Sequence, residues 1–499
     1  MAAKFDGPHA CNDGQFIVIR FRETVPDNHP VRFIDKFIDT ISVSSFEEKY
    51  KVGAGKKGRA PKDVRLMLKV ILYAIYCRIY SALKIDYATE HYADFWFFTH
   101  QKRISHDKIS DFITMHGDDL HTVFLETISL AHANDLLSFD ALYQDGFKIK
   151  ANASKQKNCT LRALDKKEVK LSANLTSVIE QLQESKDDGS RLKEKKIIQG
   201  KLSQIGNLRD ELIQRISQRS ERKSASQRRE IEKKATINQT DPDAELMKQK
   251  DNSHANSYLK ITGTDNKADI VISSTVTGHD HEACNSLPLF NQANSNLKEI
   301  DNSKTYDTAI ADSGFTQIAT CEAYEKNGVQ IIGPSKEYEV KKRKKEPDHT
   351  RITFEYDKQS DTVLCSEGFV LSKSGTHYNK VRDAYINIYS NKEACQNCAR
   401  LNDCTKSKDG YRSVKIDLRI ASQKRTLEKY LSDEGQRLYK KRSHVAETYQ
   451  GDLKNNGRFT HYYLRGLTKV SIESKIHDIV WNIRRIFSET IVGGIAWTT

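Results

Sequence analysis

The sequence has no long hydrophobic run and few cysteines. Its most apolar stretch, from Val70 to Cys77, is bounded by Lys69 and Arg78 and is far too short to span a bilayer. No segment resembles a secretory signal peptide, so we expect a cytoplasmic protein without a membrane partner. Nine cysteines among 499 residues of a chain that is not exported indicate reduced thiols or metal ligands, and they argue against a disulfide framework.

Acidic residues are also fewer than basic ones. Lys and Arg number 80 against 67 Asp and Glu, which gives a formal net charge of +13 and a pI near 9.0. This balance favours a polyanionic partner over an acidic protein surface, but charge alone does not separate nucleic acid from an anionic membrane. The chain is too long for one ordinary core, so we expect two or three structural units.

Hydrophobic periodicity divides the chain into helical and sheet-forming parts. From residue 24 to 135 the period is helical. Two helical seams, at 171–182 and 198–216, flank a break at Asp187-Asp188-Gly189 and predict an antiparallel hairpin. Packing of this hairpin on the core and dimerisation through its apolar seam both stay open. The predicted parts are an all-α N-terminal domain at 1–135, the first part of the core at 136–334 with the hairpin inserted at 155–240, a basic and cysteine-containing insertion at 335–422, and C-terminal core helices at 423–499.

Strand-like segments in the central part predict a mixed sheet. Residues 137–145 form an apolar run that ends at an acidic residue and a glycine. Residues 258–264 and 270–277 predict a β-hairpin. Residues 305–311 and 329–332, with a helix between them, predict a βαβ element. The expected fold class is therefore α/β, with helices on the sheet.

Two aspartates follow strand-like runs and precede glycines. Asp145 is followed by Gly146, and Asp312 lies two residues before Gly314. Such positions place a side chain at an exposed sheet edge, where α/β sheets carry chemistry. The competing interpretation is that each aspartate is an ordinary turn residue.

Six short segments carry a family pattern: GRAP (58–61), YQDGFKIKAN (143–152), DPDA (241–244), ADSGF (311–315), RSHVAETYQGDLK (442–454) and RGLTKV (465–470). Together they resemble, in order along most of the chain, the sequence blocks of DDE-type transposases of bacterial insertion sequences. The chain departs from that pattern at Phe147, where Thr or Ser is usual. It also departs at Val445-Ala446-Glu447, where the valine usually precedes the glutamate directly.

The resemblance implies a DNA transposase with an RNase H-like core, in which Asp145, Asp312 and Glu447 hold two Mg²⁺ ions, or Mn²⁺ as a substitute. Paired hard cations on carboxylate oxygens suit DNA cleavage and strand transfer. The implied partners are the element's terminal repeats, which the N-terminal domain would bind, and target DNA, with a homodimer as the active complex and the nucleoid as its location when bound. Glu473 is the rival for the third acid, unless it is a solvated or salt-bridged helix residue.

Several basic residues are candidate contacts for DNA phosphates. Arg442 and Lys454 flank Glu447, five residues before it and seven after it. A run of five basic residues at 341–345 predicts salt-sensitive, sequence-independent affinity. The alternatives are a generic basic helix face for the first two residues and a solvated loop for the run. The full set is Lys148, Arg442, Lys454, Arg465, Lys341, Lys342, Arg343, Lys344 and Lys345.

Four cysteines have a spacing compatible with a structural zinc ion. Cys395, Cys398 and Cys404 follow the pattern C-x2-C-x5-C, and Cys365 lies upstream. Four thiolates suffice for a tetrahedral Zn²⁺ site that would stabilise an insertion with a small core. The alternative is a set of reduced, partly buried thiols.

Two other functions stay open. A nuclease on the same scaffold would cut DNA without joining it, because a fold does not determine a reaction. A DNA-binding derivative of a transposase would keep the basic surfaces after its acids had ceased to hold metal. The presence of all three candidate acids argues against the derivative, and a strand-transfer assay separates a transposase from a nuclease.

Overall fold

The structure is a computed structural model, and it describes residue 23 and residues 25–51, 62–184, 189–221, 223–343, 352–379 and 384–492. By compactness the chain forms two units. The first comprises Met1–Thr127 and Ile479–Thr499, and the second comprises Ile128–Asp478. In the described part of the chain, no helix is long and apolar enough to cross a membrane.

The first unit is helical, in agreement with the period of the sequence. Most of its helices are amphipathic and bury one face; α4, for example, starts where the Asp63 side chain accepts the N–H of Leu66 and packs against α2. From Ile479 onward, α19 belongs to this unit, and its Phe487 ring lies 5.4 Å from that of Phe33. The helices are α2 (Pro30–Thr40), α3 (Ser44–Lys51), α4 (Val64–Tyr76), α5 (Ala82–His91), α6 (Trp96–Thr99), α7 (His106–Met115), α8 (Leu120–Ala133), which continues into the second unit, and the end of α19 (Leu467–Val492).

The second unit is built on a mixed sheet. Its strands are β1 (Leu142–Lys150), β4 (Glu245–Lys248), β5 (His254–Asp265), β6 (Val271–Thr277), β7 (Thr308–Ile310) and β8 (Gln330–Ile332). The order is β4-β5-β1-β7-β8, and β6 also pairs with β5. Strand β1 is antiparallel to β5 and parallel to β7, and β7 is parallel to β8. The predicted hairpin is β5–β6, and the predicted βαβ element is β7–α13–β8, with α13 at Ile318–Lys326.

Helices cover both faces of this sheet because side chains alternate along β1. Tyr143 packs with Val445 in a core shared with α18 (Asp433–Gly451) and also donates a hydrogen bond to the carbonyl of Leu438. The next residue, Gln144, points to the other face and hydrogen-bonds Ser286 of α12 (Ala283–Ile300). The α/β class predicted from the sequence, a mixed sheet flanked by helices, is confirmed.

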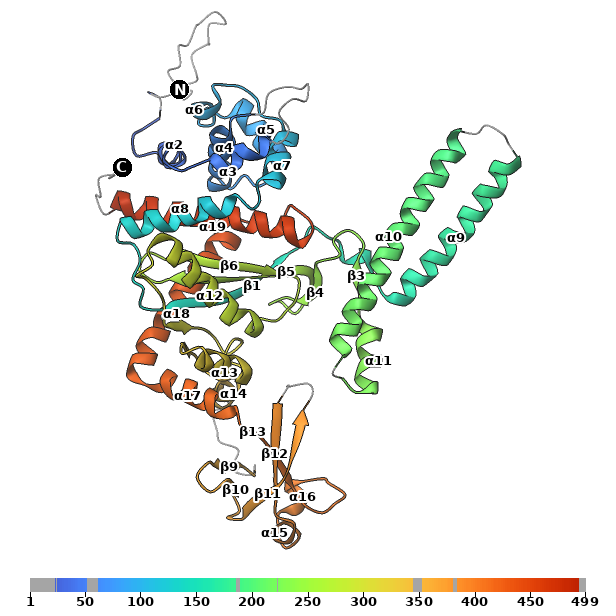
Figure 1. The fold of residues 1–499 in the computed structure, drawn as a ribbon, viewed down its shortest axis with the longest axis vertical. Helices are drawn as coiled ribbons and strands as arrows, with labels where there is room; N and C mark the ends of the chain where they lie inside the picture. Colours follow the sequence, from blue (N-terminus) through green and yellow to red (C-terminus); the bar gives the residue numbers. More distant parts are fainter. Residues whose placement is uncertain are drawn as a thin grey trace, which may run out of the picture. The chain divides into compact units, whose positions relative to one another are not determined.

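The inserted helices form the predicted hairpin. Figure 1 shows α9 (Leu161–Glu184) and α10 (Gly189–Ser220) as two long antiparallel helices. They pack through an apolar seam that includes Leu164, Ile205 and Leu212. The short strands β2 (Asn158–Cys159) and β3 (Ile237–Asn238) pair at the base, next to η1 (Lys155–Lys157) and after α11 (Ala225–Lys234). Of the break between the helices, Asp187 and Asp188 lie outside the described residues.

The cysteine-containing region forms a second, smaller sheet in the order β13-β12-β11-β10-β9. Its core is small: one buried cluster contains Val363, Cys365, Leu371 and Tyr389, and Ala384 and Ile386 are buried as well. The elements of this region and of the chain around it are α14 (Lys336–Arg343), β9 (Phe354–Asp357), β10 (Thr362–Cys365), β11 (Val370–Asn379), β12 (Ala384–Ser390), α15 (Lys392–Gln396), α16 (Leu401–Cys404), β13 (Ser413–Asp417), α17 (Ile420–Leu431) and, after α18, the π-helical turn η2 (Asp452–Asn456).

Candidate active site

Asp145 and Asp312 lie side by side at the sheet. In the parallel pair β1–β7, Tyr143 is in register with Ile310. Asp145 is two residues after Tyr143, and Asp312 is two residues after Ile310, where β7 has ended and β1 continues. The two aspartates therefore meet at the carboxyl end of β7, the edge where such sheets place ligands.

Arg442 of α18 links the two aspartates. Its Nη2 lies 2.7 Å from Oδ1 of Asp145 and 3.4 Å from Oδ2 of Asp312. Burial raises the pKa of Asp145 to about 6 in spite of Arg442, and the charge of Asp312 acts in the same direction as burial. The Nε atom of Arg442 is buried and has no hydrogen-bond partner among the described residues. Arg442, predicted to contact phosphate, thus neutralises the acids in this structure.

A third acid near the pair is Glu282, the residue before α12. A Cβ atom added to Gly146 would lie 2.7 Å from its Oε1, and one added to Gly314 would overlap its Oε2. Burial raises the pKa of Glu282 to about 7, and Asp312 and Asp145 act in the same direction. Sequence reasoning missed this residue. The available signal was an acid between a strand and the start of a helix.

Glu447 does not join the two aspartates. On α18 the sheet-facing side chains are Arg442, Val445 and Tyr449, which contact Asp145, the core and Phe147 respectively. Five residues after Arg442, an α-helix has turned about 140° away from that direction. The side chain of Glu447 is exposed.

Glu473, the rival acid, has a structural position. Its side chain is buried and accepts hydrogen bonds from the backbone N–H groups of Tyr463 and Leu464, at 2.9 Å each for the shortest contacts. Burial raises its pKa to about 7. Glu473 therefore orders the loop before α19.

Two of the family-like segments meet at the start of α19. Asp241 accepts a hydrogen bond from the N–H of Gly466 at 3.1 Å, and Asp243 accepts one from the N–H of Leu467 at 2.7 Å. Gly466 has φ of +83°, a conformation that favours glycine. Segments DPDA and RGLTKV thus cap a helix, where carboxylates satisfy unpaired N–H groups.

Two of the candidate phosphate contacts lie on or beside β1. The ammonium group of Lys454 lies 5.3 Å from the centre of the Phe147 ring, and burial lowers its pKa to about 8. Phe147, the departure from the family pattern, thus supplies the ring for this contact. Lys148 binds Asp280 at 2.6 Å.

The other basic candidates are less well defined by their contacts. Arg465 is exposed and donates to the carbonyl oxygen of Asn152 at 2.9 Å. Lys341, Lys342 and Arg343 end helix α14, but their side chains lie outside the described part, as do Lys344 and Lys345 entirely. The GRAP segment at 58–61 is outside it as well.

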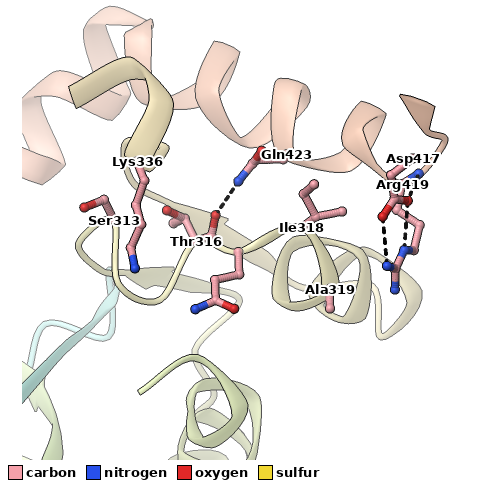
Figure 2. A pocket seen from close by; sticks show the side chains of 9 residues that line it. Ser313, Thr316, Ile318, Ala319, Lys336, Asp417, Arg419 and Gln423 are labelled. Atoms are coloured by element: carbon pink, nitrogen blue, oxygen red, sulfur yellow. Dashed lines mark hydrogen bonds and ion pairs between the residues drawn. The ribbon is translucent and has the colours of Figure 1, made fainter. Parts of the chain in front are cut away.

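A cavity of about 440 Å³ lies beside the loop that carries Asp312. Figure 2 shows Ser313 and Lys336 near each other at the loop, and Gln423 of α17 bonded to the carbonyl oxygen of Thr316 at 2.7 Å. Its lining is mixed: apolar side chains such as Ile318 and Ala319 lie beside the charged side chains of Lys336 and Arg419.

The four candidate zinc ligands line one cavity. Cys365, Cys395, Cys398 and Cys404 surround it together with apolar side chains and Arg412, and all four are free thiols. In the described ranges, no three Cys, His, Asp or Glu side chains are already arranged to hold a metal ion. This holds for the cysteines and for the acids around Arg442.

Two family models match parts of the chain. Residues 364–487 match a model described as transposase DDE domain. Residues 19–115 match a model described as transposase domain (DUF772). The first match includes Arg442 and Glu447, whereas Asp145 and Asp312 fall outside both. No curated protein and no solved structure matches the chain.

Proposed function

We propose that this chain, which matches transposase family models over residues 19–115 and 364–487, is a DDE-type transposase that cleaves DNA at the ends of its element and joins the free 3′-hydroxyls to target DNA. The observation that carries this proposal is the register of β1 with β7, which sets Asp145 beside Asp312. Both aspartates bind the guanidinium of Arg442, which an ordinary turn residue would not need to do.

The acids present suit a divalent metal. Carboxylate oxygens are the ligands that Mg²⁺ and Mn²⁺ prefer, and the carboxylates of Asp145 and Asp312 meet here at one guanidinium. Bound Mg²⁺ would activate the attacking water or 3′-hydroxyl and stabilise the leaving oxygen. In this proposal, Asp145 and Asp312 hold the metal, and the third ligand, predicted as Glu447, comes from another acid or from a rearranged α18.

Arg442 has a second role in this proposal. A guanidinium binds carboxylate and phosphate with the same planar geometry. With a divalent ion held by Asp145 and Asp312, the guanidinium of Arg442 would be free to contact a phosphate of the DNA strand. The residue thus keeps the two acids together before DNA arrives and positions the backbone afterwards.

DNA is the proposed partner, in the form of the element's terminal repeats and the target. Lys148, Lys454 and Arg465 lie on or near β1 and its neighbouring segments and would bind backbone phosphates, and the run at 341–345 would add to this. The N-terminal helical unit would bind the element ends. We place the protein in the cytoplasm, at the nucleoid when bound, and its active complex is a homodimer.

A structural zinc ion is proposed for the small sheet. The four thiols already share one cavity, and the buried core of this sheet has few members. Small units of this kind commonly depend on a metal for stability. Binding of Zn²⁺ would draw the four sulfurs to about 2.3 Å from the ion.

The proposal is tested with the full-length protein and a duplex that carries the sequences flanking its gene. With Mg²⁺ and a supercoiled target plasmid, we expect cleaved ends and joined products. Asp145→Asn should abolish both products, and the matched control Asp140→Asn, an exposed residue just before β1, should retain them. Cleavage without joining would favour a nuclease, and binding without cleavage would favour an inactive derivative.

A further inference from the structure

The carboxylate of Glu282 lies between the two glycines that accompany the aspartates. Gly146 directly follows Asp145. Gly314 donates its N–H to Oδ1 of Asp312 at 2.7 Å. Ideal Cβ atoms on both glycines would collide with Glu282, whose Oε1 is 2.7 Å from the one on Gly146. One carboxylate thus touches the backbone beside both acids.

Space, and not backbone conformation, explains these two glycines. Both have φ outside the left-handed region, which other glycines such as Gly466 occupy. A methyl group at Gly146 would also lie 3.1 Å from Cγ and Cδ of Glu282. The glycines therefore form a cradle that keeps the Glu282 carboxylate next to Asp145 and Asp312.

The carboxylate of Glu282 adds its negative charge to those of Asp145 and Asp312. Glu282 is half-buried, and among the described residues its carboxylate has no hydrogen-bond or ion-pair partner. Three carboxylates thus lie together. Arg442 binds Asp145 and Asp312, and Lys148 and Lys250 act on Glu282 and Asp145 through their charge alone. Like charges this close destabilise one another unless a cation joins them.

We propose that Glu282 is the third carboxylate of the metal-binding site, in the place that the sequence pattern assigned to Glu447. This inference rests on the proposed function. Glu282 stands at the start of α12 on the same sheet edge as the aspartates, and Glu447 is exposed on α18. A divalent cation of the Mg²⁺ class would take oxygens from Glu282, Asp145 and Asp312.

The test is Mn²⁺ binding to the full-length protein without DNA, measured by electron paramagnetic resonance and by calorimetry. Glu282→Gln keeps the size of the side chain and removes its charge. We expect it to weaken Mn²⁺ binding by more than about tenfold, the loss typical of even outer-shell changes. The matched control Glu447→Gln should bind Mn²⁺ like the wild type, and Asp145→Asn should lose binding.

Two further variants separate a ligand from a merely structural residue. Glu282→Asp keeps the charge and should restore part of the affinity that Glu282→Gln loses. Gly146→Ala displaces the carboxylate and should weaken Mn²⁺ binding although it removes no charge. Thermal melting without metal shows whether each variant is folded.

The outcomes distinguish this inference from the proposed function. Normal Mn²⁺ binding by folded Glu282→Gln together with weak binding by Glu447→Gln would overturn the inference and restore Glu447. Normal binding by Asp145→Asn, or no Mn²⁺ binding by the wild type, would overturn the metal site itself.

Discussion

The buried carboxyl group of Glu473 makes the stability of this protein depend on pH. Its side chain is 7% exposed, and burial raises the pKa of its carboxyl group from 4.5 to about 7. A raised pKa means that the folded state binds more protons than the unfolded state between these values. The contribution of protonated Glu473 to the free energy of unfolding is therefore fully present below pH 4.5. It is lost as the pH rises toward 7 and beyond.

The magnitude follows from the shift. One pKa unit corresponds to about 1.4 kcal/mol, so Glu473 should destabilise the fold by about 2 to 3 kcal/mol more at pH 8 than at pH 5. Glu473→Gln removes the titration and keeps one oxygen for the N–H groups of Tyr463 and Leu464. Relative to the wild type, the variant should gain that difference between pH 5 and pH 8.

Urea unfolding followed by circular dichroism at pH 5, 6, 7 and 8 measures this. The other acids with raised pKa values, Asp145, Glu282 and Asp241, are present in both proteins and cancel in the comparison. Glu447→Gln, at an exposed helical position, serves as the control and should follow the wild type. Parallel pH profiles of the wild type and Glu473→Gln, within about 0.5 kcal/mol, would refute the reasoning.

Three other predictions concern metal and DNA. Asp145→Asn should bind duplex DNA in a gel shift as well as the wild type does, because it alters a metal ligand and leaves the basic residues in place. Replacing the charges at 341–345 should lower affinity for every sequence and flatten its salt dependence by about one unit of slope per lost phosphate contact; an unchanged slope would place this run away from DNA. Purified protein should contain one zinc per chain by elemental analysis, and Cys398→Ser should lose both the zinc and several degrees of melting temperature. Zinc-free wild-type protein of unchanged stability would return the cysteines to ordinary thiols.

The elements of the fold follow largely from local sequence. A helical period and capping residues such as Asp63 mark the N-terminal helices. The pair of helical seams predicts the inserted hairpin, and β-rich runs predict β5–β6 and β7–α13–β8. These signals are readable because burial of one face imposes a period on the residues of each element.

The sequence also allowed the two aspartates to be predicted as site residues. Asp145 and Asp312 each follow an apolar run and each have a glycine nearby, and parallel pairing of their strands then brings them to one edge. The sequence pattern around Glu447 could not show toward which side of helix α18 that side chain points. Each residue along α18 turns the side chain by 100°, so the displacement by one position at Val445-Ala446-Glu447 decides whether a glutamate faces the sheet or the solvent.

Contacts between distant segments were decided by the tertiary structure alone. The sequence separates Arg442 from Asp145 by 297 residues, and no period or spacing records that a guanidinium lies between two carboxylates. The same holds for Glu282, which reaches the aspartates only because β6 and α12 return the chain to their edge of the sheet. Local composition sets which faces are buried, whereas packing of complete elements sets which charged groups meet, because that choice depends on every neighbour at once.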